Sequence, residues 1–255
     1  IDSKLQGYAE DAVKDQMRIL QRRFYSVWGN EDPWEDSEHK KVDYPDRAKK
    51  SLPIYSLLQK RFPNQPDSVD AYFNKKKKMR IFTYKGDRDT LFSTMDSIRY
   101  YGKILNTGMM TLEPKSGKIK VWVGGLDHKY FKYDHVRATR QVGSTFKPFV
   151  YGTAIENGIS PCDKILNQPV TIPRGMHGLE QAWTPKNSAK SPLDGEPLSL
   201  KMALANSINS ITAKIMKDFG PNAVIDLARR CGLSGAIEPV PSICLGTPDV
   251  SLFEM

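Results

Sequence analysis

The chain has 255 residues, a length that allows one or two domains and a sizeable buried core at roughly 150 residues per domain. Charged residues make up 26% and hydrophobic residues 39% of the composition, which excludes a disordered tail or a low-complexity polymer. No apolar run is long enough to span a bilayer, and Ile1–Lys4 does not resemble a secretory signal. Any targeting segment or membrane anchor of the parent protein is therefore expected outside this chain.

The net charge of +9 is spread along the sequence rather than gathered in one stripe. Nucleic acid is therefore not an expected partner. The only dense basic block is Lys75–Lys78, followed by Arg80. We interpret it as a solvated loop before a strand, and contact with an anionic polymer or lipid surface is the alternative.

The cysteine and histidine patterns do not indicate a metal centre. Three cysteines without a C-x-x-C spacing favour neither a disulfide framework nor a zinc site, and Cys162, Cys231 and Cys244 are each expected in the core. The four histidines show no H-x-x-x-H spacing. No metal is expected.

The first part of the chain reads as mainly helical. Apolar residues recur at helical spacing after Asp2, a candidate N-cap, and predict a long helix that stops near Gly29. Residues 30–50 suggest an irregular connection. The segments that follow are short helices or turns over 51–78, a strand over Met79–Tyr84 and a helix from Ser93 to about Asn106.

The sequence pattern changes after residue 107. Two short strands, Met109–Leu112 and Lys118–Val123, predict a β-hairpin. A helix is expected after Gln141 as far as about Asn157, and residues 160–197 should be mostly loop. Three helical pieces close the sequence, at Ser199–Ala205, Ser210–Phe219 and about Pro221–Arg230.

Ser144-Thr-Phe-Lys147 carries the first candidate chemistry. Residues three apart share one face of a helix, so the hydroxyl and the amine can meet. Gly143 and Pro148 place Ser144 at a helix N-terminus, where the dipole favours a negative intermediate and disfavours a protonated Lys147. Partial burial lowers a lysine pKa in the same direction, as a general base requires. An S-x-x-K also arises by chance, and Ser37–Lys40 in a polar loop is interpreted as such a match.

Ser207-Ile-Asn209 is the second candidate and the only S-x-N in the chain. It links two helical pieces, so its hydroxyl and carboxamide can point the same way, toward a substrate. Helix capping by Ser207 or Ser210 is the alternative explanation.

The two motifs together pair S-x-x-K with S-x-N, as in penicillin-binding proteins and class A β-lactamases. Further segments resemble the transpeptidase module of class A penicillin-binding proteins over residues 94–255: Gly143–Phe149, Pro161–Ile165, Trp183–Asn187, Leu200–Asn209, Leu245-Gly246 and the hairpin Leu112–Gly125. The opening residues look like the connector after the glycosyltransferase module of that family.

The resemblance implies an α/β (α+β) transpeptidase fold shared with serine β-lactamases, an antiparallel sheet flanked by helices. Residues 1–107 would be a connector region and residues 108–255 a partial transpeptidase domain. The family's third box, K-[TS]-G, does not follow Asn209. Lys115-Ser116-Gly117 matches it in the wrong order, so we treat it as a decoy and expect the fold to be incomplete at its C-terminal end.

The resemblance also implies a DD-transpeptidase that crosslinks peptidoglycan stem peptides ending in D-Ala-D-Ala and is acylated by β-lactams. Ser144 would be the nucleophile, Lys147 its base, Ser207 a proton relay and Asn209 a substrate ligand. Acyl transfer of this kind needs no cofactor. The parent protein would be membrane-anchored on the periplasmic side of the bacterial inner membrane. A β-lactamase, a β-lactam sensor or a non-catalytic binding fragment are the alternatives.

Overall fold

The computed structural model describes residues 1–29, 31–34, 40–188 and 192–255. The chain forms two compact units, residues 1–136 (unit 1) and residues 137–255 (unit 2). The chance match Ser37–Lys40 begins outside the described residues.

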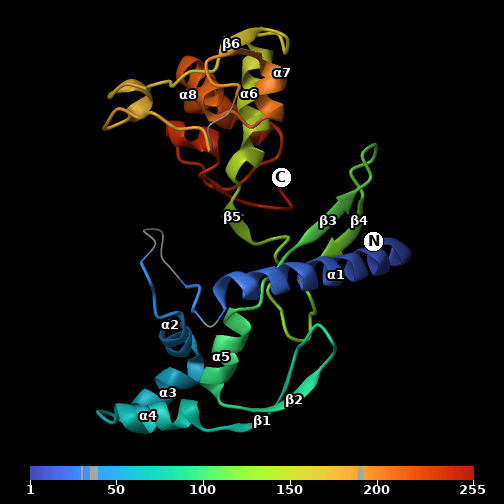
Figure 1. The fold of residues 1–255 in the computed structure, drawn as a ribbon, viewed down its shortest axis with the longest axis vertical. Helices are drawn as coiled ribbons and strands as arrows, with labels where there is room; N and C mark the ends of the chain where they lie inside the picture. Colours follow the sequence, from blue (N-terminus) through green and yellow to red (C-terminus); the bar gives the residue numbers. More distant parts are fainter. Residues whose placement is uncertain (30, 35–39, 189–191) are drawn as a thin grey trace. The chain divides into compact units, whose positions relative to one another are not determined.

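Helix α1 (Ser3–Trp28) opens unit 1 and confirms the predicted long helix (Figure 1). The Asp2 carboxylate caps it, because Oδ1 accepts from the backbone N–H of Lys4 at 3.0 Å and of Leu5 at 3.1 Å. The helix ends at Gly29, whose φ of 53° a glycine adopts without steric cost. Of the apolar positions that predicted the helix, Ala9, Val13 and Met17 are buried.

Proline sets the starts of the next three helices: α2 (Tyr44–Ser51), α3 (Pro53–Arg61) and α4 (Pro66–Asn74). Each has proline in its first turn, where the missing N–H would have no helical partner. The prediction of short helices or turns over 51–78 is confirmed as far as Asn74, but Lys77 and Lys78 belong to the strand that follows. The prediction of an irregular connection over 30–50 is wrong for residues 44–50, because Asp43 caps α2 and Pro45 lies in its first turn, where proline does not break a helix.

Unit 1 also contains two antiparallel hairpins and α5 (Thr94–Gly102), which begins at a Ser93–Asp96 capping box. The predicted strand over Met79–Tyr84 begins two residues earlier and ends three residues earlier, as β1 (Lys77–Ile81). It pairs with β2 (Arg88–Phe92), which the pattern missed. The predicted hairpin is confirmed as β3 (Met109–Leu112) and β4 (Ile119–Val123).

Unit 2 is built on helices α6 (Lys147–Glu156), α7 (Leu200–Ala205) and α8 (Asn209–Arg230). A kink at Gly220, with φ of 78°, divides α8 where two separate helices were predicted. Three 3₁₀ turns accompany them: η1 (Gly143–Phe146), η2 (Met176–Gly178) and η3 (Pro241–Leu245). The strands form the pairs β5 (Thr139–Gln141) with β8 (Asp249–Ser251) and β6 (Lys164–Leu166) with β7 (Pro197–Ser199).

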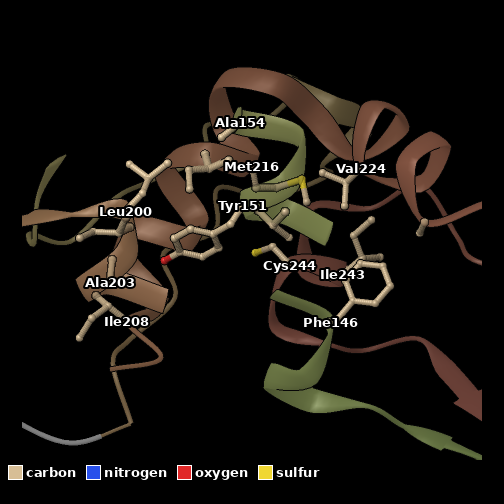
Figure 2. Close-up of a cluster of buried hydrophobic side chains, with 14 of the residues drawn as sticks. Phe146, Tyr151, Ala154, Leu200, Ala203, Ile208, Met216, Val224, Ile243 and Cys244 are labelled. Carbon is tan, nitrogen blue, oxygen red and sulfur yellow. The ribbon is translucent and has the colours of Figure 1, made fainter. Parts of the chain in front are cut away.

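The core of unit 2 lies where α6 packs against α8 and η3 (Figures 1 and 2). Phe146, Val150 and Ala154 of the η1–α6 segment are fully buried, as are Ile215 and Met216 of α8. This packing fixes the turn that leads into α6, and with it the position of Ser144.

The fold is a mixed helix and strand architecture, as predicted. All described strand pairs are antiparallel, and they are divided among four two-stranded sheets rather than joined in one. In the part of the chain that the structure describes, each helix is too short or too polar to cross a bilayer.

One expectation about the cysteines is wrong. Cys244 is buried in the core of unit 2, but Cys162 and Cys231 are exposed. Cys162 lies in the turn before β6 and Cys231 follows the last turn of α8, and such positions face solvent because chain connections run over the surface.

Candidate active site

The turn η1 presents Ser144 on the surface of unit 2, three residues before Lys147, the first residue of α6. The backbone N–H of Gly143 donates to the carbonyl oxygen of Gly246 at 2.9 Å, at the end of η3. A Cβ on Gly246 would lie 1.8 Å from the Gly143 oxygen, so only glycine permits this approach. The η3 segment therefore supports the turn that carries the serine.

Lys147 points into the unit, and its side chain is buried, with a relative exposure of 1%. Its Nζ makes three hydrogen bonds, all to Ser207 and Asn209 at the start of α8. The partners are the Ser207 carbonyl oxygen at 2.6 Å, the Ser207 Oγ at 2.9 Å and the Asn209 Oδ1 at 2.6 Å. The amine is thus held by the S-x-N segment.

Ser207 has a φ of 53°, in the left-handed region that non-glycine residues seldom adopt. Such a conformation costs roughly 1–2 kcal/mol for an L-residue. This left-handed conformation occurs at the residue whose carbonyl and hydroxyl oxygens both contact Lys147 Nζ. Backbone strain at a position with this many polar contacts is typical of functional sites.

Ser207 also connects the other two groups, because its Oγ lies 3.0 Å from Ser144 Oγ. Within the described residues Lys147 Nζ has no hydrogen bond to Ser144, so the predicted direct meeting of amine and hydroxyl is replaced by a chain through Ser207. In the structure Lys147 Nζ donates to Ser207 Oγ, and Ser207 Oγ donates to Ser144 Oγ.

A neutral amine has two N–H bonds. It donates them to the Ser207 carbonyl oxygen and to Asn209 Oδ1, because these two oxygens can only accept. When the amine is neutral, its lone pair can accept from the Ser207 hydroxyl, and that hydroxyl can then accept from Ser144.

Burial lowers the pKa of Lys147 below its ordinary value. The neighbouring Cys244 thiol opposes this shift only when it is ionised, and burial raises its own pKa to about 12. At neutral pH the thiol is therefore uncharged and offers Lys147 no counter-charge. The environment favours the neutral amine, which a general base requires.

The structure brings together all four residues that the sequence singled out: Ser144, Lys147, Ser207 and Asn209. The K-[TS]-G decoy, Lys115–Gly117, lies in the turn between β3 and β4 of unit 1. Sequence reasoning missed the contacts that the segment Trp183–Asn187 makes with Asn209. The only signal for them was the place of this segment among the motifs of the resemblance.

Comparison with known proteins gives two family matches. Residues 29–105 match the penicillin-binding protein middle domain, and residues 107–238 match the penicillin binding protein transpeptidase domain. The chain belongs to the penicillin-binding proteins, which confirms the resemblance. The division into a connector and a transpeptidase domain at residue 107 stays a prediction, and the middle-domain match covers most of the expected connector.

Several relatives carry the name penicillin-binding protein 1A. The protein of Rickettsia felis is 29% identical over all of this chain and 34% of its own length. The protein of Neisseria lactamica is 33% identical over 58% of this chain and 18% of its own length. A crystal structure of penicillin-binding protein 1A from Haemophilus influenzae covers 58% of this chain and 22% of its own, with 27% identity and a TM-score of 0.53. The chain thus spans about a third of the length of the first of these relatives.

Proposed function

We propose that unit 2 carries the acyl-transfer site of a peptidoglycan DD-transpeptidase, with Ser144 as nucleophile. The observation that carries the proposal is the hydrogen-bonded chain from Ser144 through Ser207 to a buried Lys147. Membership of the penicillin-binding proteins supports the same reaction class. The donor substrate is a stem peptide ending in D-Ala-D-Ala, and the site lies in the bacterial cell envelope, on the periplasmic side of the inner membrane.

In the first step the Ser144 oxygen attacks the carbonyl carbon of the penultimate D-Ala. The Ser144 proton passes to the Ser207 oxygen while the Ser207 proton passes to Lys147 Nζ. Ser207 thus stays neutral, and Lys147 gains the proton that Ser144 loses. The backbone N–H of Ser144 stabilises the oxyanion. The peptide C–N bond then breaks, and the proton on Lys147 returns through Ser207 to the amine of the departing D-Ala. An ester on Ser144 remains.

In the second step an amine of another stem peptide attacks the ester carbonyl. The bond to Ser144 Oγ breaks, an amide crosslink forms, and the amine's proton returns through the relay to the serine oxygen. Asn209 accepts a hydrogen bond from Lys147 Nζ and, in this mechanism, also binds the amide of the donor peptide. A β-lactam presents a similar amide and leaves a persistent ester on Ser144.

Fluorescent penicillin tests the assignment on the full-length protein that contains this chain. We expect one slowly lost label per molecule, and none in Ser144→Ala, with unchanged thermal unfolding of that variant. Crosslinking of a D-Ala-D-Ala stem peptide with release of D-Ala then tests the substrate. Rapid turnover of the label would indicate a β-lactamase, and the absence of label from the folded protein would refute the acyl-serine mechanism.

A further inference from the structure

The N-terminus of α8 is capped by a side chain from another segment. The backbone N–H groups of Asn209 and Ser210 donate to Asn187 Oδ1 at 2.9 and 3.2 Å. These donors have no partner within the helix, and the residue before α8 is Ile208, which has no polar side chain. The Asn187 carboxamide therefore takes the place of a local capping residue.

The residue beside it fixes the amide of Asn209. Asn209 Nδ2 donates to the Lys186 carbonyl oxygen at 2.9 Å. Because a carbonyl only accepts, the amide nitrogen must point to Lys186, which leaves Asn209 Oδ1 directed at Lys147 Nζ. The pair Lys186–Asn187 thus sets both the backbone and the side-chain direction of Asn209.

The side chain of Asn187 is itself held by further hydrogen bonds. Its Nδ2 donates to Asn167 Oδ1 at 3.2 Å and to Asp194 Oδ1 at 3.4 Å. Asn167 is 2% exposed, and its Oδ1 also accepts from Ser210 Oγ at 2.5 Å. The Asn187 Nδ2 faces two acceptors and the Asn187 Oδ1 faces two backbone N–H donors. Only one orientation of the amide therefore satisfies all of these hydrogen bonds.

We propose that Asn187 is a positioning residue of the acyl-transfer site. It holds the first turn of α8, and through it Ser207 and Asn209, in register with Lys147. All three hydrogen bonds of the Lys147 amine go to Ser207 and Asn209. A displacement of the N-terminus of α8 therefore moves all three hydrogen-bond partners of Lys147 together. This inference rests on the proposed function.

The test measures acylation of the full-length protein by fluorescent penicillin at a series of concentrations. The data separate the non-covalent dissociation constant, the rate constant of acylation at saturation and the labelled fraction. We expect Asn187→Ala to lower that rate constant about 10- to 100-fold, the range expected for misplaced reacting groups, with little change in the dissociation constant. A merely structural role would lower the labelled fraction and the unfolding temperature but leave the rate constant unchanged.

Ser199→Ala is the matched control, because Ser199 Oγ caps α7 through the Met202 N–H at 3.2 Å. It removes a cap in the same unit, and we expect a lower unfolding temperature with the wild-type rate constant. Two further variants keep the test decisive if Asn187→Ala does not fold. Asn187→Gln moves the amide by one methylene and should slow acylation, whereas N187D/D194N keeps an acceptor for both N–H groups and should restore most of the rate.

Wild-type rate constants in both Asn187→Ala and Asn187→Gln would overturn the positioning role. Equal slowing by Ser199→Ala would also overturn it, because the effect would then follow from helix stability alone. A folded wild-type protein that takes no label would instead refute the proposed function, and the inference would fall with it.

Discussion

The amine of Lys147 has no carboxylate partner among the described residues. Its hydrogen bonds go to a carbonyl, a hydroxyl and an amide oxygen, so nothing in this set compensates a buried positive charge fully. Ser144, by contrast, is exposed at the surface. In the proposed mechanism the pair divides the chemistry between an accessible nucleophile and a buried base.

Lys147→Ala removes the group that we propose accepts the proton, while Ser144 and Ser207 remain in the chain. We expect acylation by fluorescent penicillin to fall about 10²- to 10⁴-fold, the usual contribution of a positioned base. The fold should survive, and circular dichroism and thermal unfolding check this. Acylation at the wild-type rate in the folded variant would remove the lysine from the mechanism.

The lowered pKa of Lys147 also predicts a pH dependence of acylation. Only the neutral amine accepts a proton, so the acylation rate constant should rise with pH through the pKa of Lys147 and then level off. Because burial lowers this pKa, the midpoint should lie below the ordinary lysine value of about 10.4. Stopped-flow labelling across the pH range measures the midpoint, with thermal unfolding at each pH as control. A midpoint at or above the ordinary value would contradict the role of burial.

At the scale of elements, the 3₁₀ turns η1 and η3 approach each other closely at Gly143 and Gly246. The end of η3 approaches the start of η1 so closely that Gly246 has no room for a Cβ beside the Gly143 carbonyl. Gly246 also has a φ of 82°, which is unfavourable for other residues. A side chain here has to displace the turn that carries Ser144.

Gly246→Ala should therefore lower both the unfolding temperature and the acylation rate. Gly232→Ala is the control, because Gly232 also has a positive φ, of 109°, but open space around its missing Cβ. We expect Gly232→Ala to cost about 1–2 kcal/mol of stability with an unchanged acylation rate. Thermal unfolding and penicillin labelling compare the two variants. Equal effects on labelling would show that close packing of η3 on η1 does not position the serine.

The elements that the sequence predicted are those whose signal is local. Helix α1 has both a cap and a long apolar period, and the β3–β4 hairpin has a turn between two apolar runs. Strand β8 has three residues, and its pairing with β5 depends on residues more than a hundred positions away, so no local pattern marks it. The same limit applies to the site. The motifs identify Ser144, Lys147, Ser207 and Asn209, but the left-handed Ser207 and the cap from Asn187 arise only from tertiary packing.

At the scale of the whole chain, the two units have separate cores. The core clusters of unit 1 include Phe73, which is completely buried against Leu58, Val69 and Met95. The core of unit 2 is built from α6, α7, α8 and η3 and contains Ile215, also completely buried. The four candidate site residues all belong to unit 2. A domain with its own core is able to fold on its own, so damage to one core should not by itself unfold the other.

Phe73→Ala tests this independence on the full-length protein. Loss of a buried phenylalanine costs about 3–5 kcal/mol, so the unfolding transition of unit 1 should move to lower temperature in calorimetry. Penicillin labelling should keep its wild-type rate and stoichiometry below that transition, because the hydrogen bonds of the site lie within unit 2. Ile215→Ala, which damages the core of unit 2, should instead reduce the labelled fraction as the transition of that unit falls. Parallel loss of labelling in Phe73→Ala would mean that the catalytic geometry depends on unit 1 and that the two units fold as one.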